Sequence, residues 1–526
     1  MEESSSKTTQ PESPLAYDVG LEGLTVFEKK AHLVNRELDG MGMGKYQWMI
    51  FGLCGFGYLL DLLWAQAFGL VVAPLQQELG FSDGEVGNIV SAFAVGLTAG
   101  AFVWGILVDI IGRMWAFNFT VLITSVFGLC LGIPSSYGTI LLVTSLVGFG
   151  VGGNIPIDTT ITLEFIPQDR RYLLPLLSVF QPVGVVICSA LAYAWIPSFS
   201  CNVGLKSCRH VSAGEACCTK ADNHGWRYFL FTLGGITLVV FFLRFVVFRF
   251  QESPKYLLHR QKDAEAVRVM QEIARYNNRT SAITLEMLTS LADTEAAIDE
   301  ACVDESVSET RSLRWGKTYR GKLRIELDRY QLFFRNATVA RLTLLIWTIY
   351  IFDFWGFSIA GGLLPYILQK KSEQAGLSTE SIYRAFVYIY LFGIPGVLLG
   401  ARLYRGRQLA MLISSALMSA SLFVFTTVDT IPKYIGIGGL EYFFQSMFNA
   451  VLYGWTAEAY PAPIRGTATG VASFWGRLSS IIAPVIGQRL LQSSYDAPLY
   501  LGAAGVLIAT LSIALLPTSY IGAESF

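Results

Sequence analysis

Charged residues are scarce in this sequence. Asp, Glu, Lys and Arg make up 15% of its 526 residues, while 53% are hydrophobic; a soluble domain has about 25% charged residues. This shortage excludes an ordinary soluble protein and indicates a membrane protein. The net charge of −1 provides no excess of basic groups, so we expect no nucleic acid among its partners.

Residues for catalysis and cofactor binding are also few. The four histidines lie outside the long apolar runs, which argues against a metalloenzyme. Gly316-Lys317-Thr318 is similar to the end of a nucleotide-binding loop, but Arg311 stands where the first glycine is needed. We therefore expect no enzyme activity, no cofactor and no metal.

No apolar segment opens the chain. Residues 1–46 are polar and contain Pro11 and Pro14, whereas a secretory signal peptide needs an apolar core near its start. The first membrane span is thus expected to direct its own insertion.

Long apolar runs dominate the rest of the chain. A helix needs about 20 mostly apolar residues to cross a bilayer, and the sequence predicts twelve such spans, at 48–74, 86–108, 115–134, 139–166, 173–196, 228–250, 340–366, 384–404, 408–427, 434–457, 470–491 and 498–517. The predicted fold is an all-α membrane protein with two six-helix bundles, 48–250 and 340–517. A polar loop, 251–339, joins the bundles, and the tails are 1–47 and 518–526. Within the loop, residues 262–274 have the periodicity of an amphipathic surface helix.

Arginine positions predict the orientation. The loops after spans 1 and 3 contain no Lys or Arg, whereas arginines gather at the ends of even-numbered spans and in the loops that follow them: Arg113, Arg170, Arg171, Arg402, Arg405, Arg407 and Arg465. Because Lys and Arg favour the cytoplasmic side, both termini and the central loop are expected in the cytoplasm.

Half of the eight cysteines lie in one loop, 198–226, between spans 5 and 6. The arginine count places this loop outside the cell, where disulfides persist. The four cysteines allow three connectivities, of which the vicinal bridge is the least expected, and a metal site with His210 is the alternative. They are Cys201, Cys208, Cys217 and Cys218. The glycosylation motifs at Asn118, Asn278 and Asn336 fall outside the extracellular loops, so we predict no N-glycan.

One short motif, E-x-x-P-x-x-x-R, occurs twice, at 164–171 and 458–465. The copies are 294 residues apart (458 − 164), and Gly112-Arg113 and Gly406-Arg407 keep the same spacing (406 − 112). A repeat of this length predicts two similar membrane halves, which is typical of secondary transporters.

The repeated motif predicts a gate. Its proline ends a helix, so the glutamate sits in the last turn. A carboxylate is unfavourable there, at the negative end of the helix dipole, unless a nearby cation neutralises it. Arg171 and Arg465, with the arginines at the ends of spans 2 and 8, are the expected partners of Glu164 and Glu458. Such ion pairs either break and re-form as the halves move or form a static network.

Several motifs carry a family resemblance. Gly105-Ile-Leu-Val-Asp-Ile-Ile-Gly-Arg113 resembles the G-x-L-x-D-x-x-G-R signature of the major facilitator superfamily, and Glu252-Ser-Pro-Lys-Tyr-Leu257 resembles an element of its sugar porters. With residues 28–48 and 148–158, the chain looks like the fungal branch that resembles synaptic-vesicle-glycoprotein-2 and metabolite–proton symporters. The resemblance implies twelve helices in two pseudo-symmetric halves, with Asp109 and Arg113 as a cytoplasmic latch. The second half has Leu403 in place of Asp109, and span 7 lacks the hexose-porter element.

Polar groups inside the spans are the candidate coupling and binding residues. Ionisable groups are costly in hydrocarbon and often mark proton relays or substrate sites. The candidates are Asp61, Asp158, Asp353, Glu441, Gln445, Asn449, Arg477, Gln66 and Gln181. Glu441, Gln445 and Asn449 share one helix face, and Arg477 is expected to bind an anionic solute or to neutralise Glu441 or Asp353. Hydrogen-bonded structural groups are the alternative for each.

The predicted function is secondary active transport, coupled to protons, of a small sugar-like or carboxylate solute by alternating access. We expect a multi-pass monomer in the plasma membrane, with the solute, protons and lipid as its partners. Proton-antiport efflux of a fungal secondary metabolite or toxin is the alternative. A non-transporting nutrient sensor is a third reading, although sensors of this fold carry longer tails.

Overall fold

The computed structural model describes residues 26–170, 173–202, 205–212, 215–247, 250–291, 333–334, 336–374, 378–428, 430–460 and 465–517. Three of the predicted gate groups, the side chains of Asp109, Glu458 and Arg465, lie outside this described part, as does Arg171 altogether. The described residues form helices and contain no β-strand beyond an isolated bridge between Ser207 and Cys218.

The first six-helix group follows the predicted spans. Its helices are α2 (Lys45–Leu79), α3 (Val86–Ile111), α4 (Arg113–Cys130), α5 (Tyr137–Val151) with α6 (Asn154–Phe165), α7 (Leu173–Leu177) with α8 (Phe180–Trp195), and α9 (Gly225–Phe242) with the π-turn η4 (Leu243–Val247). A short 3₁₀ turn, η2 (Asp83–Glu85), precedes α3. In hydrocarbon a helix satisfies its own backbone hydrogen bonds, which is why each long apolar run adopts this form.

The second group repeats this arrangement. It consists of α14 (Ala337–Phe357), the π-turn η5 (Ser358–Leu363) and α15 (Leu364–Gln374), α16 (Thr379–Leu391) with α17 (Gly393–Arg402), α18 (Arg407–Phe425), α19 (Ile431–Glu458), α20 (Arg465–Leu491) and α21 (Ala497–Ala514). Among the described residues, ten helices are long and apolar enough to cross a membrane. The other two predicted spans, 434–457 and 470–491, lie within α19 and α20, which have 28 and 27 residues.

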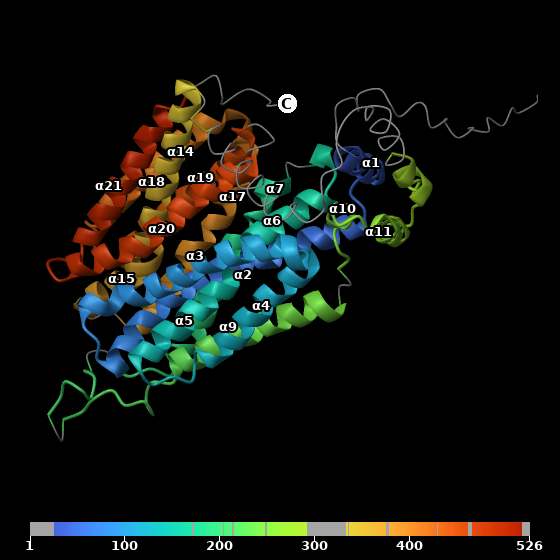
Figure 1. Cartoon of the computed structure of the whole chain (residues 1–526). Coiled ribbons are helices and arrows are strands. Elements are labelled where there is room, and N and C mark those ends of the chain that lie inside the picture. The colour runs from blue at the N-terminus through green and yellow to red at the C-terminus, as the bar shows by residue number, and fades with distance from the viewer. Residues whose placement is uncertain are drawn as a thin grey trace, which may run out of the picture.

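The two groups lie side by side (Figure 1), the first in blue to green and the second in yellow to red. Large apolar side chains cover the outside of the bundle; Phe102, for example, is 69% exposed. Such a surface suits lipid rather than water. Where the groups meet, α2 passes so close to η5 that a Cβ on Gly69 would lie 2.7 Å from the Gly361 carbonyl oxygen.

The two ends of the bundle differ. At one end, α1 (Val26–Met41), α10 (Pro254–His259) and α11 (Asp263–Tyr276) lie together (Figure 1); we call this the cap end. An ion pair between Lys30 and Asp263 joins α1 to α11, and α11 is the amphipathic helix predicted from the sequence. The loop between α8 and α9 marks the opposite end, which we call the loop end.

Candidate functional site

A fully buried ion pair lies inside the first group. Asp158 on α6 faces Arg244 on η4, with 3.7 Å between Oδ1 and Nη2, and both side chains are 0% exposed. Arg244 also donates to the Leu53 carbonyl oxygen (2.9 Å) and lies over the Phe117 ring, 3.8 Å from its centroid. Sequence reasoning singled out Asp158 but missed Arg244. The rule that selected Arg477, a cation within an apolar run, would have found it.

Asp61 lies next to this pair on α2. Its side chain is 7% exposed, one carboxylate oxygen has no hydrogen-bond partner, and its charged neighbours are Asp158 and Arg477. One turn away, Gly57 allows the close approach of α2 to α6, because a Cβ there would collide with the Asp158 carboxylate. Residues from α2, α6 and η4 thus form a cluster of two aspartates and one arginine.

Arg477 reaches this region from the second group. Its Nη1 donates to the carbonyl oxygens of Leu97 on α3 (2.8 Å) and Gly152 at the end of α5 (3.4 Å). The charge of Asp61 acts on Arg477 through space, without a direct ion pair between the two side chains. The expected pairing with Glu441 or Asp353 is not what the structure shows: Arg477 points across the interface into the first group.

Asp353 on α14 has a different partner. With its amide nitrogen turned toward the carboxylate, Asn449 on α19 donates to both oxygens of Asp353, at 3.0 and 3.2 Å. Asp61 and Asp353 are 292 residues apart in the sequence (353 − 61), close to the repeat spacing of 294, but the first has a charged environment and the second an amide partner.

A small cavity lies between the two groups. Residues from α2, α8, α14, α17 and α19 line it: Leu62, Gln181, Pro182, Phe357, Val397, Tyr442, Gln445, Ser446 and Asn449. Three of the predicted binding residues, Gln181, Gln445 and Asn449, therefore meet there. Gln66 does not line it; its amide donates to the Tyr390 hydroxyl at 2.8 Å.

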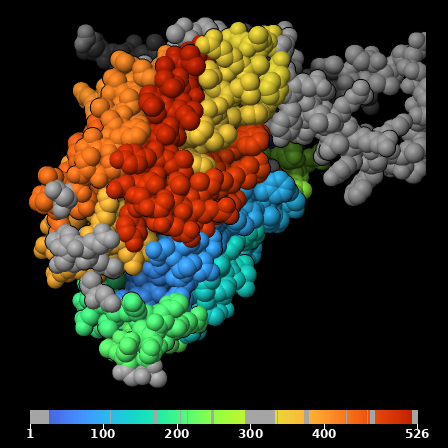
Figure 2. Space-filling model, turned by 90° about the vertical axis from the view of Figure 1, so that its left-hand side faces the viewer, coloured from blue at the N-terminus to red at the C-terminus, as the bar shows by residue number. Residues whose placement is uncertain are grey.

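Hydrogen bonds join the two groups between this cavity and the loop end. They connect Ser91 to the Ile481 carbonyl (2.9 Å), Tyr383 to the Leu70 carbonyl (2.7 Å), Gln488 to Asn88 (3.0 Å) and Tyr366 to Gln76 and Asp83 (2.7 and 2.8 Å). In Figure 2 the red helices of the second group directly adjoin the blue helices of the first. The structure is therefore closed at the loop end.

Comparison with known proteins identifies the family that has this architecture. The family model described as Major Facilitator Superfamily matches residues 54–440 and 346–525. The chain belongs to this superfamily. Sequence relatives include MFS siderochrome iron transporter 1 of Ceriporiopsis subvermispora (34% identity, 93% of this chain and 90% of the relative). The niacin transporter NiaP of Acinetobacter baylyi (25%; 87% and 90%) and the synaptic vesicle 2-related protein of Bos taurus (25%; 92% and 80%) are also similar. The fold matches the xylose transporter XylE of E. coli, with a TM-score of 0.63, 14% identity, and 90% and 98% coverage. The family resemblance and the fold predicted from the sequence are confirmed.

The major facilitator motifs meet at the cap end. Arg113, from the G-x-L-x-D-x-x-G-R signature, places Nε 3.3 Å from Oε1 of Glu164, the glutamate of the first E-x-x-P-x-x-x-R copy. Glu252 accepts from the backbone N–H groups of Arg113 and Met114, at 2.9 and 3.2 Å. A carboxylate at the start of α4 complements the positive end of the helix dipole. The structure thus joins three motifs that are distant in sequence.

The cysteine-rich loop of this major facilitator contains two disulfides, Cys201–Cys218 and Cys208–Cys217, with Cα–Cα distances of 5.7 and 4.9 Å. The vicinal cysteines bond to different partners, as expected. His210 binds the Gly80 carbonyl oxygen (2.7 Å), and the part of the chain that the structure describes holds no group of three metal-ligating side chains.

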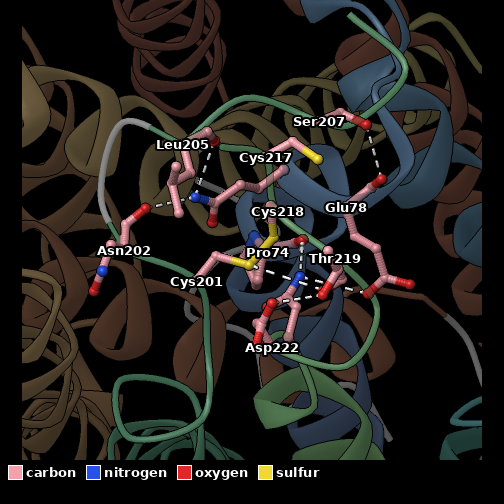
Figure 3. Close-up of a disulfide and its surroundings, with 12 residues drawn as sticks. Pro74, Glu78, Cys201, Asn202, Leu205, Ser207, Cys217, Cys218, Thr219 and Asp222 are labelled. Atoms are coloured by element: carbon pink, nitrogen blue, oxygen red, sulfur yellow. Dashed lines mark hydrogen bonds between the residues drawn. A yellow bond between two sulfur atoms is a disulfide. The ribbon is translucent and has the colours of Figure 1, made fainter. Parts of the chain in front are cut away.

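The disulfide-bonded loop rests on the end of α2 (Figure 3). Gln77 donates to the carbonyl oxygens of Asn202 and Leu205 (2.8 and 3.1 Å), and Ser207 donates to that of Glu78 (2.9 Å). The Glu78 carboxylate also accepts two 2.7 Å hydrogen bonds from Arg227 on α9. This bidentate pair, which sequence reasoning missed, fastens α2 to α9 beside the loop.

Replacing Cys201 with Ser is expected to destabilise the protein by about 2–4 kcal/mol, because the disulfide limits the unfolded chain. Thermal unfolding of the purified protein in detergent, followed by tryptophan fluorescence, measures the loss. Cys130→Ser is the matched control, since Cys130 is a free, partly buried cysteine on α4. Equal melting temperatures for Cys201→Ser and wild type would contradict the prediction.

Proposed function

We propose that this major facilitator is a proton-coupled secondary transporter that moves a small organic solute by alternating access. The observation that carries the proposal is Asp61, a buried carboxyl group that lies where Arg477 crosses from the second group into the first. An acid at the interface of the moving halves links protonation to their relative position.

The mechanism follows from the charges. Ionised Asp61 attracts Arg477, whose guanidinium donates hydrogen bonds to the carbonyl oxygens of Leu97 on α3 and Gly152 at the end of α5. Protonation removes that attraction, which is strong in a medium of low dielectric constant. The contact between the halves then weakens, and the protein can open at the loop end. Asp158 is the second choice for this role, because Arg244 already neutralises it.

The remaining polar groups have two separate roles, solute binding and gating. Gln181, Gln445 and Asn449 line the central cavity and supply hydrogen-bonding groups for a solute. At the opposite side of the cavity from the closed end, Arg113 and Glu164 form a pair that serves as the gate. We place the cap end and both termini in the cytoplasm and the disulfide-bonded loop outside the plasma membrane, in agreement with the stability of disulfides there.

The relatives do not agree on a solute. Their names refer to a siderochrome, niacin and xylose, so no single substrate carries over to this chain. The class of solute must therefore be inferred from the residues at the cavity. We propose import as the direction of transport, because the sequence resembles proton symporters, in which the inward proton gradient drives uptake of the solute.

Proton flux in proteoliposomes tests the proposal. Purified protein is reconstituted with a pH-sensitive dye inside the vesicles, and an inward proton gradient is imposed. Each candidate solute that the protein carries should produce a solute-dependent acidification of the lumen and accumulate inside. Solute uptake that is equally fast with and without the gradient would overturn the coupling.

A further inference from the structure

One buried acid has no place in the mechanism above. Glu441 on α19 is 4% exposed, and its Oε1 has no hydrogen-bond partner. Gln445 is one turn along the same helix face and lines the cavity. Its amide nitrogen is likewise buried without a partner. An unpaired acceptor and an unpaired donor thus stand one turn apart on α19, with the donor in the lining of the cavity and the acceptor one turn closer to the loop end.

Two tyrosines flank this acid. Tyr442 directly follows Glu441 on α19, and its ring packs edge to face with that of Tyr390 on α16, with centroids 4.9 Å apart; the charge of Glu441 acts on both tyrosines. Tyr442 also lines the cavity. The face of an aromatic ring attracts cations, and a carboxylate adds a full opposite charge. Acid and rings therefore favour the same kind of ligand group.

Basic side chains do not balance this acid. Within the described residues, no Lys, Arg or His forms an ion pair with Glu441. The two arginines buried near the middle of the spans have other partners. Arg477 donates to the carbonyl oxygens of Leu97 and Gly152, and Arg244 forms an ion pair with Asp158. The residues that line the cavity include no basic one. A buried carboxylate without a counter-charge is costly, and a cationic ligand would remove that cost.

We propose that the central site selects solutes that carry a protonated amine or quaternary ammonium group. Glu441 is the counter-charge, Tyr390 and Tyr442 form the aromatic walls, and the amides of Gln181 and Gln445 bind the polar remainder. The ammonium group sits toward the loop end, one turn of α19 from the centre of the cavity. The lining of the cavity contains no basic side chain that would pair with an anionic solute, so the ammonium class takes precedence over the carboxylate solutes expected from the sequence. This inference rests on the proposed transport function.

Binding of matched probes tests the charge preference. The full-length protein in detergent is titrated with two isosteric sets: choline, 3,3-dimethylbutan-1-ol and 3,3-dimethylbutanoate, and then 2-phenylethylammonium, 2-phenylethanol and phenylacetate. Thermal stabilisation reports binding. In at least one set the ammonium compound should bind about tenfold or more tightly than its neutral and anionic counterparts, a difference of about 1.4 kcal/mol.

Variants assign the preference to the acid. Glu441→Gln should reduce ammonium affinity about tenfold, whereas Glu441→Asp should retain most of it because the charge remains. Glu265→Gln, the same change on the exposed face of α11, is the matched control. Tighter or equal binding of the neutral or anionic probe in both sets, no binding by either ammonium compound, or unchanged affinity in Glu441→Gln would each overturn the proposal.

The outcome is separable from that of proton coupling. Thermal stabilisation is measured without a gradient, so ammonium binding that depends on Glu441 supports this inference even if transport proves independent of protons. Conversely, gradient-driven uptake of a neutral or anionic solute that Glu441→Gln leaves intact would refute the inference and keep the transporter.

Discussion

Asp61→Asn is expected to abolish accumulation of solute against its gradient, reducing gradient-driven uptake to the level of empty vesicles. Asparagine has nearly the shape of a protonated aspartic acid but cannot lose the proton. The variant should therefore mimic the protonated state permanently, with the attraction for Arg477 removed. Because the proton can no longer be released, the gradient has nothing to drive.

Exchange should survive in the same variant. If the solute-loaded protein still reorients, labelled solute outside the vesicles exchanges with unlabelled solute inside without net proton movement. Proteoliposome assays of gradient-driven uptake and of exchange, performed on one preparation, measure both. Loss of both activities would indicate structural damage instead of lost coupling.

Asp353→Asn is the matched control, because Asp353 follows Asp61 at nearly the repeat spacing, on the first helix of the second half. Its carboxylate is held by the Asn449 amide, without the basic neighbour that Asp61 has. We expect gradient-driven uptake to persist in Asp353→Asn, with a change in solute affinity because Asn449 lines the cavity. The opposite pattern, with Asp353 essential and Asp61 dispensable, would move the coupling site to the second half.

Much of the fold follows from one-dimensional patterns. Apolar length located the spans, because each helix satisfies its backbone bonds within itself. The amphipathic helix α11 followed from its 3.6-residue period, and the position of the cysteines in one loop predicted disulfides. The Glu164–Arg113 contact also followed, since a carboxylate at the end of a helix requires a cation.

Contacts between helices could not be predicted in the same way. Sequence reasoning expected Arg477 either to bind an anionic solute or to neutralise Glu441 or Asp353, but the packing of α20 against α3 directs it to the Leu97 carbonyl. The disulfide connectivity had three solutions, and the path of the loop over the end of α2 selects one. Gln66 was expected near the solute, yet the closure of the halves brings it to Tyr390. Each of these outcomes depends on how separate segments pack, which no local pattern records.

Arg244→Met is expected to be among the most destabilising single substitutions in the first half. It leaves Asp158, which is 0% exposed, as a buried charge without its partner. Breaking a buried ion pair from one side typically costs about 3–5 kcal/mol. Loss of the hydrogen bond to the Leu53 carbonyl and of the contact with the Phe117 ring adds to the effect. Thermal unfolding in detergent should show a large decrease in melting temperature.

The double variant Asp158→Asn/Arg244→Met separates charge from packing. With both charges removed, no uncompensated ion remains, so the double variant should be more stable than Arg244→Met alone. Lys262→Met is the matched control, because Lys262 pairs with Glu265 on the exposed surface of α11, where ion pairs contribute little. If the losses from Asp158→Asn and Arg244→Met simply add, the two residues are not coupled. Their burial would then reflect packing alone, and Asp158 would become available as the second candidate for carrying the proton.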